Sequence, residues 1–155
     1  MGITRIVGFP PNLSGIDTYG VGPGSSFGKP DALIALDQKI FMFWTNGDSR
    51  FDHDSYSAVS LDSGKTWELG QERIFTYAPA GFRVRGICQC GKGSEGAPDD
   101  YFYVYFGLNR HPDIYLARVE KDQIFDAVAY EWFEYILPDG GASWTPDFGK
   151  KAIVF

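Results

Sequence analysis

The sequence predicts an all-β protein built from many short strands. Of its 155 residues, 17% are aromatic, and aromatic side chains favour the pleated, half-buried surface of a sheet. Its 19 Gly and 9 Pro residues are spread along the chain, where they favour tight turns between strands. A hydrophobic fraction of 44% is sufficient for a single folded domain with its own core.

The first half of the chain predicts one four-stranded unit over residues 28–70. Residues 31–45 form an apolar hairpin, 55–61 a third strand, and 66–69 a fourth strand after a turn. Continuous apolar strands imply burial on both faces, which either the stacked blades of a β-propeller or the two layers of a sandwich provide. Four sequential strands over about 40 residues match one propeller blade.

The second half predicts a second, less regular blade over residues 82–136. Its strongest β stretch is the aromatic run at 101–106, and one or two helical turns are expected at 120–129. The other expected strands are 83–89, 113–119 and 130–135, with a Gly-rich loop at 91–99.

Partial blades are expected at both ends of the chain. Residues 4–9 predict a short strand followed by a polar loop at 12–27, and residues 144–155 begin a further unit. At roughly 40–45 residues per blade, the chain makes about three four-stranded blades. Closed propellers need about four or more, so we expect open blade edges that are capped, shortened or paired with another copy in a homo-oligomer.

One motif locates the propeller architecture. Ser60, Asp62, Gly64, Thr66 and Trp67 match every specified position of an Asp box, the turn between the third and fourth strands of a blade. The Asp side chain is expected to accept hydrogen bonds from nearby backbone amides, and the Gly to supply a positive φ. The Trp is expected to pack under the hairpin. The motif occurs in sugar-active propellers and also in non-enzymes, so we interpret it as structural.

The charge of the chain limits its partners. The net charge is −6 and no cluster of Lys and Arg is long enough to follow a phosphate backbone, so no nucleic-acid partner is expected. No stretch approaches the ~20 apolar residues of a membrane span, so no membrane partner is expected either. The absence of phosphate-loop, dinucleotide and zinc motifs predicts no cofactor and no metal.

Two further features bear on the cellular compartment. The sequence after Met1 has no apolar run long enough for a signal peptide, so the protein is cytoplasmic or its true N-terminus is missing here. Cys88 and Cys90 share one strand face, where a disulfide would be strained. We interpret them as packed or free thiols rather than a redox or metal pair.

A further order of motifs runs along most of the chain. Its segments are 28–33, 39–43, 96–105, 114–119, 121–124, 129–133 and 152–155, together with the Asp box and Trp144. This order resembles the family known as domain of unknown function 4185, over roughly residues 20–155. The resemblance implies a truncated five-bladed propeller related to glycoside hydrolases, some of which cleave D-arabinan in bacterial cell walls. Full-length members are about twice as long, and the resemblance implies a bacterial protein that is secreted at full length.

Carboxylates at strand starts are the candidate catalytic groups. Glycoside hydrolysis requires two of them, about 5–5.5 Å apart for retention and about 6.5–9.5 Å apart for inversion. Asp31 opens an inner strand, Asp100 (with its neighbour Asp99) precedes the aromatic strand, and Asp113 opens the next strand. Each also fits a plain turn residue at a strand start.

Three other residues are candidate ligand-binding groups. Lys29 and Arg83 can hold a carboxylate-bearing or hydroxyl-rich ligand, and His111 titrates near neutral pH. Solvated or ion-paired surface side chains are the alternative for all three. The sequence therefore predicts a carbohydrate-active propeller that acts on or binds a cell-wall polysaccharide. The alternative is a non-catalytic sugar- or protein-binding fragment without enzyme activity.

Overall fold

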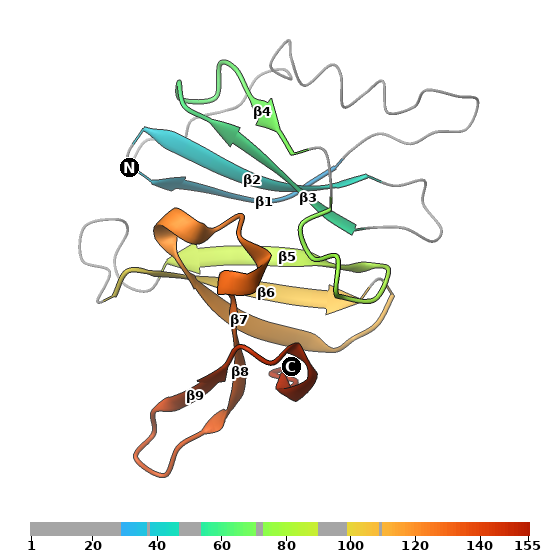
Figure 1. Cartoon of the computed structure of the whole chain (residues 1–155), viewed down its shortest axis with the longest axis vertical. Helices are drawn as coiled ribbons and strands as arrows, with labels where there is room; N and C mark the ends of the chain where they lie inside the picture. Colours follow the sequence, from blue (N-terminus) through green and yellow to red (C-terminus); the bar gives the residue numbers. More distant parts are fainter. Residues whose placement is uncertain (1–28, 37, 47–53, 71–72, 90–98, 109) are drawn as a thin grey trace.

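The computed structural model describes residues 29–36, 38–46, 54–70, 73–89, 99–108 and 110–155. The prediction of an all-β protein is confirmed: these residues form two antiparallel sheets, with strand orders β1-β2-β3-β4 and β5-β6-β7-β8-β9 (Figure 1). No helix in the described part of the chain is long and apolar enough to cross a membrane.

The first sheet contains β1 (Lys29–Leu36), β2 (Lys39–Asn46), β3 (Asp54–Ser60) and β4 (Glu68–Leu69). The second contains β5 (Phe82–Gln89), β6 (Tyr101–Leu108), β7 (Ile114–Glu120), β8 (Glu131–Ile136) and β9 (Ala142–Thr145).

The last described segment pairs with the second sheet. Residues 142–145 form β9, which pairs with β8, and Ile153 forms an isolated bridge with Tyr115 of β7. The reason is a tight turn at which Leu137 N donates to Gly141 O at 2.7 Å and Gly140 takes φ +87°. Such a turn reverses the chain onto its own sheet.

The number of blades therefore differs from the expectation. Among the described residues there are two sheets rather than three, and these sheets do not close into a ring. The second sheet has five strands where four were expected. The partial unit expected at 4–27 lies outside the described residues. The helical turns expected at 120–129 are two short 3₁₀ turns, η1 (Lys121–Gln123) and η2 (Ala127–Ala129).

The main core lies between the two sheets. Alternate side chains of β6 are fully buried, as the two-residue period of a strand requires when one face is covered. Phe106 stacks on Phe82 of β5 with ring centroids 5.4 Å apart, and both rings contact Trp132. The buried members are Ala32, Phe41, Phe43, Phe75, Ala78, Phe82, Val84, Phe102, Val104, Phe106, Ala117, Val119, Ile124, Tyr130 and Trp132.

A second buried cluster lies on the other face of the first sheet. It contains Met42, Trp44, Ala58 and the Asp-box residue Trp67. Trp44 is 1% exposed and stacks on Tyr56 with centroids 4.9 Å apart. Trp44 here and Trp132 in the main core are therefore both core residues.

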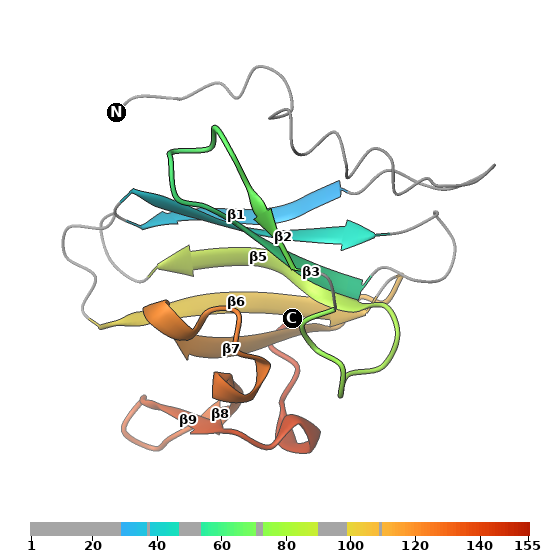
Figure 2. The ribbon, with the colours of Figure 1, turned by 45° about the horizontal axis from the view of Figure 1, so that its top comes forward.

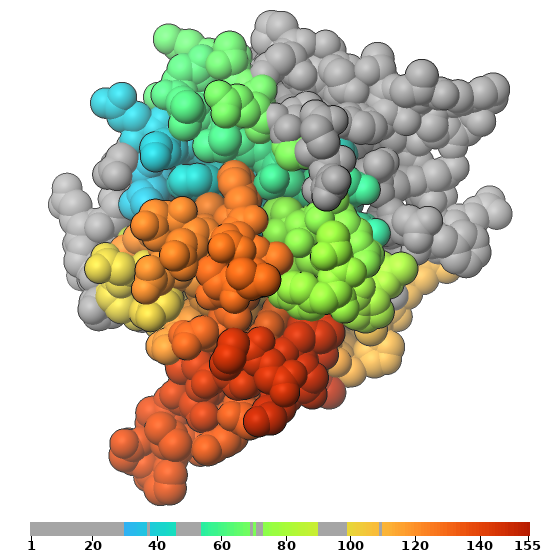
Figure 3. All heavy atoms as spheres, viewed as in Figure 1, coloured from blue at the N-terminus to red at the C-terminus, as the bar shows by residue number. Residues whose placement is uncertain are grey.

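The two sheets are joined along their first strands and by the segment that links them. Strand β1 packs against β5, and Figure 2 shows these strands running across the molecule one above the other. The linking segment 73–81 lies beside the turns that follow β7, where Tyr77 Oη donates to Ala127 O at 3.0 Å. In Figure 3 these light-green and orange segments lie side by side over the junction.

Candidate functional site

The Asp box builds a self-contained turn after β3. Asp62 Oδ1 accepts hydrogen bonds from the backbone N–H groups of Lys65 and Thr66, at 3.0 and 2.8 Å. Its Oδ2 accepts from Thr66 Oγ1 at 2.7 Å, and Ser60 Oγ accepts from Gly64 N at 2.7 Å. Gly64 takes φ +88°, a conformation that favours glycine. The bonds from Thr66 above all lower the pKa of Asp62 to about 2. This carboxylate is engaged within its own turn.

A different aspartate joins the two sheets at the other end of β1. Asp31 interrupts the register between β1 and β2, where Pro30 pairs with Trp44 and Ala32 with Phe43. Such a bulge re-aims the side chain of the extra residue. Asp31 Oδ1 lies 3.7 Å from an Nη atom of Arg83 on β5, and both side chains are largely buried, at 13% and 17% exposure. The pair therefore links the first strands of the two sheets.

A second arginine lies beside this pair. Arg85 interrupts the register of β5 in the same way, because Val84 pairs with Phe106 and Gly86 with Tyr105. Its Nη2 donates to the backbone oxygen of Leu108, the last residue of β6, at 2.7 Å. Burial, followed by repulsion from Arg83, lowers the pKa of Arg85, and Asp31 opposes that shift.

The loop before β7 reaches the same end of the strands. Leu108 O also accepts from His111 N at 3.2 Å, so one carbonyl contacts both Arg85 and this loop. His111 Nδ1 lies 3.2 Å from Asp113 Oδ2, and their side chains are 52% and 27% exposed. We call Asp31, Arg83, Arg85, His111 and Asp113 the strand-start cluster.

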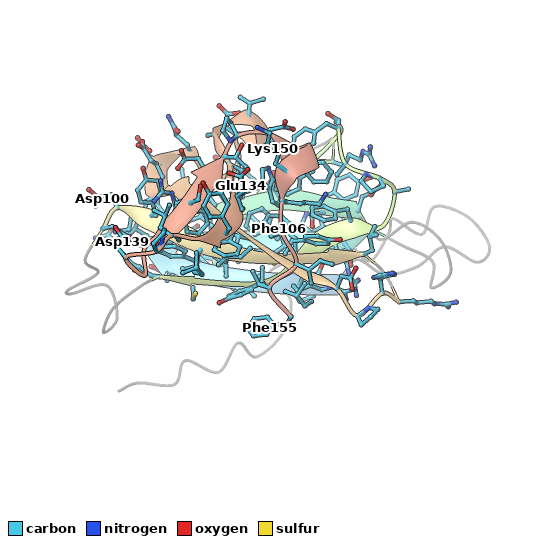
Figure 4. The ribbon with its side chains drawn as sticks, turned by 90° about the horizontal axis from the view of Figure 1, so that it is seen from below. Asp100, Phe106, Glu134, Asp139, Lys150 and Phe155 are labelled. Atoms are coloured by element: carbon cyan, nitrogen blue, oxygen red, sulfur yellow. The ribbon has the colours of Figure 1, made fainter. Side chains whose placement is uncertain are left out.

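Two predicted site residues remain to be placed. Lys29 opens β1 and so lies at the same end as the strand-start cluster. Asp100 lies apart, because it precedes β6 whereas the cluster surrounds the last residues of that strand. Its side chain is 99% exposed and 3.5 Å from Lys121 Nζ. Figure 4 shows Asp100 at one end of the sheet, away from Phe106. The neighbouring Asp99 accepts from Tyr103 Oη at 2.7 Å, as a turn residue would.

Two residues were missed by the sequence analysis. Arg85 shares a Phe-Arg-Val-Arg segment with Arg83, and the alternation of charged and apolar residues could have indicated that both point away from the core. Asp54, at the start of β3, accepts from Arg73 Nη1 and Gly81 N, each at 3.1 Å. Its position at a strand start is the signal that also marked Asp31 and Asp113.

The described residues contain no group of three or more side chains suited to a metal ion. Cys88 is exposed on β5, and Cys90 lies outside the described residues. The resemblance to the domain of unknown function 4185 family stays a prediction. Comparisons of the chain with known protein families and with curated proteins find no match.

Proposed function

We propose that this chain is a carbohydrate-binding, propeller-like protein whose ligand site is the strand-start cluster. The observation that carries the proposal is the pairing of Asp31 with Arg83 between the first strands of the two sheets. Sugar sites combine carboxylates, which accept from hydroxyl groups, with guanidinium groups, which donate to ring and hydroxyl oxygens. The cluster offers both kinds of group at one end of the molecule.

The propeller part of the proposal has two supports. The first sheet is a four-stranded meander with an Asp box between its third and fourth strands, the arrangement expected of one blade. The second sheet follows with its first strand packed against the first strand of its neighbour. Neighbouring propeller blades meet in this manner, with first strands nearest the axis and ligands near the axis.

The geometry favours binding over hydrolysis. A glycosidase needs one carboxyl group that stays protonated near neutral pH, together with a second carboxylate. Asp31 is held in an ion pair with Arg83, so this carboxylate already has a guanidinium partner within the protein. The second candidate function, glycoside hydrolysis, is favoured by a single observation, that Asp113 lies at the same end as Asp31.

A polysaccharide-binding experiment tests this proposal. The chain is run in affinity gels that contain soluble polysaccharides, and release of reducing ends is measured in parallel. We expect retardation by at least one polysaccharide that is weakened in Asp31→Asn. The matched control, Asp100→Asn, alters an exposed aspartate at the opposite end and should behave as wild type.

The outcomes separate the two candidate functions. Retardation without reducing ends supports a binding protein. Reducing ends that disappear in both Asp31→Asn and Asp113→Asn would replace binding with hydrolysis. The absence of retardation by every polysaccharide, or equal loss in the Asp100 control, would overturn the assignment of this site.

A further inference from the structure

Two arginines of β5 lie near the end of β6. Arg83 lies opposite Gly107 in the β5–β6 register, and Arg85 reaches back to Leu108 O because it occupies the bulge. Both guanidinium groups therefore lie at the end of the molecule where β1 and β5 begin. Neither arginine faces the apolar core formed by Phe82 and Val84.

The Nε atoms of Arg83 and Arg85 are buried donors, and none of the described residues supplies an acceptor for them. The contact of Arg83 with Asp31 is 3.7 Å long, which is an ion pair but too long for a hydrogen bond. Buried donors without acceptors are costly, and they are often explained by a ligand that supplies the acceptor.

Gly107 allows Arg85 to approach β6 closely. A Cβ atom at this position would lie 3.2 Å from Arg85 Nε and 3.1 Å from Asp113 O. The absence of a side chain therefore places the buried Nε atom close to the backbone of Gly107 and near the loop that ends at Asp113.

The two guanidinium groups have different partners among the described residues. Asp31 forms an ion pair with Arg83, whereas Arg85 donates to the backbone carbonyl of Leu108, and Asp113 lies against His111. Burial, followed by repulsion from Arg83, lowers the pKa of Arg85. An anion between them would relieve both the repulsion and the unused donors.

Resting on the proposed function, we infer that Arg83 and Arg85 bind an oxyanion carried by the polysaccharide, so the ligand is an acidic one. Arginine donates two parallel N–H groups to a carboxylate or sulfate, a geometry that lysine lacks. The net charge of −6 argues that such binding needs a local site, because the protein as a whole repels polyanions.

The experiment compares polymers that differ in charge alone. Polygalacturonate is paired with its methyl ester for the carboxylate, and dextran sulfate with dextran for the sulfate. We expect at least one charged polymer to bind about tenfold or more tightly than its neutral counterpart, and less tightly at higher salt. Arg85→Gln should remove this preference. Lys65→Gln, which removes an exposed positive charge at the Asp-box end, should keep it.

Two further measurements keep the test decisive. Thermal melting confirms that each variant folds, and Arg83→Lys and Arg85→Lys retain the charge but lose the Nε donors. We expect the lysine variants to bind the charged polymer several-fold more weakly. Unchanged binding in folded lysine and glutamine variants would overturn the inference.

The outcomes also separate this inference from the proposed function. Equal binding of charged and neutral polymers, unaffected by Arg85→Gln, leaves carbohydrate binding intact and refutes the anion site. If no polymer binds but millimolar galacturonate or sulfate raises the melting temperature in an Arg85-dependent way, the anion site stands and carbohydrate binding fails. If neither polymers nor small anions bind, both fail.

Discussion

Strand β3 has a buried serine near each end, and the two serines hold different kinds of contact. Ser60 Oγ bonds to Asp62 and Gly64, two and four residues away. Ser55 Oγ accepts from Val84 N at 2.8 Å, from a residue 29 positions away in the other sheet. The first serine closes a turn, whereas the second joins two sheets.

This difference shows where the candidate site depends on the whole fold. Strand β5 is an edge strand, and Ser55 provides the acceptor that the N–H of Val84 would otherwise lack. The same edge carries Arg83 and Arg85. The Asp-box turn forms from contacts within a few residues, but the strand-start cluster forms only after the two sheets have packed, because long-range contacts require the intervening chain to close.

The largest expected effect on stability comes from the packing between the two sheets, on which the strand-start cluster depends. Phe82 begins β5, is 2% exposed and stacks on Phe106. We expect Phe82→Ala to lower the free energy of unfolding by about 3–5 kcal/mol, measured by urea denaturation. Phe155→Ala is the control, since its ring is 77% exposed. A loss below about 1 kcal/mol, as seen for surface positions, would show that this ring does not hold the sheets together.

The Asp-box turn, which forms from short-range contacts, could be predicted from the sequence. The Asp box needs only the eight residues 60–67, and the roles expected of Asp62 and Gly64 correspond to contacts and a φ angle within that segment. The hairpin 31–45 and the aromatic strand were also predicted, because alternating or continuous apolar residues report local geometry.

The strand-start cluster, which depends on long-range contacts, could be predicted only in part. Strand starts indicated Asp31 and Asp113, and side-chain chemistry indicated Arg83, but neither showed which of these residues lie together. The pairing depends on bulges, and in the described strands the three register shifts fall at Asp31, Arg85 and Glu134. A bulge is an inserted residue that is set by strand pairing across the sheet, so no local pattern marks it. Asp100 was grouped with the others because sequence order does not tell the two ends of a strand apart in space.

An intermediate effect comes from exchanging the two serines of β3 for alanine. Ser55→Ala leaves the buried N–H of Val84 without its acceptor, which should cost about 1–3 kcal/mol of unfolding free energy. Ser60→Ala should cost about 1 kcal/mol, because Gly64 is only half-buried and water can replace the lost acceptor. Urea denaturation of both variants gives the order. If Ser60→Ala were the more destabilising, the Asp-box turn would contribute more to stability than the contact between the two sheets at Ser55.

The smallest effect is a pH dependence confined to the Asp-box end. Hydrogen bonds, chiefly from Thr66, lower the pKa of Asp62 from 3.8 to about 2 in the folded chain. Its contribution to stability is therefore complete above the unfolded value and is lost as the pH falls from 3.8 toward about 2. The melting temperatures of wild type and Asp62→Asn should converge over this window.

A substitution at Thr66 tests the cause of the lowered pKa of Asp62 without changing the strand-start cluster. Thr66→Val removes the hydroxyl that bonds Asp62 Oδ2 at 2.7 Å, so the pKa of Asp62 should rise toward its ordinary value in an NMR titration. Ligand binding at the strand-start cluster should not change, because Asp31 draws its partner from β5 and not from this turn. A Thr66→Val variant that weakened binding would show that the two ends of the sheet are coupled, and a constant pKa would show that the hydroxyl is not its main cause.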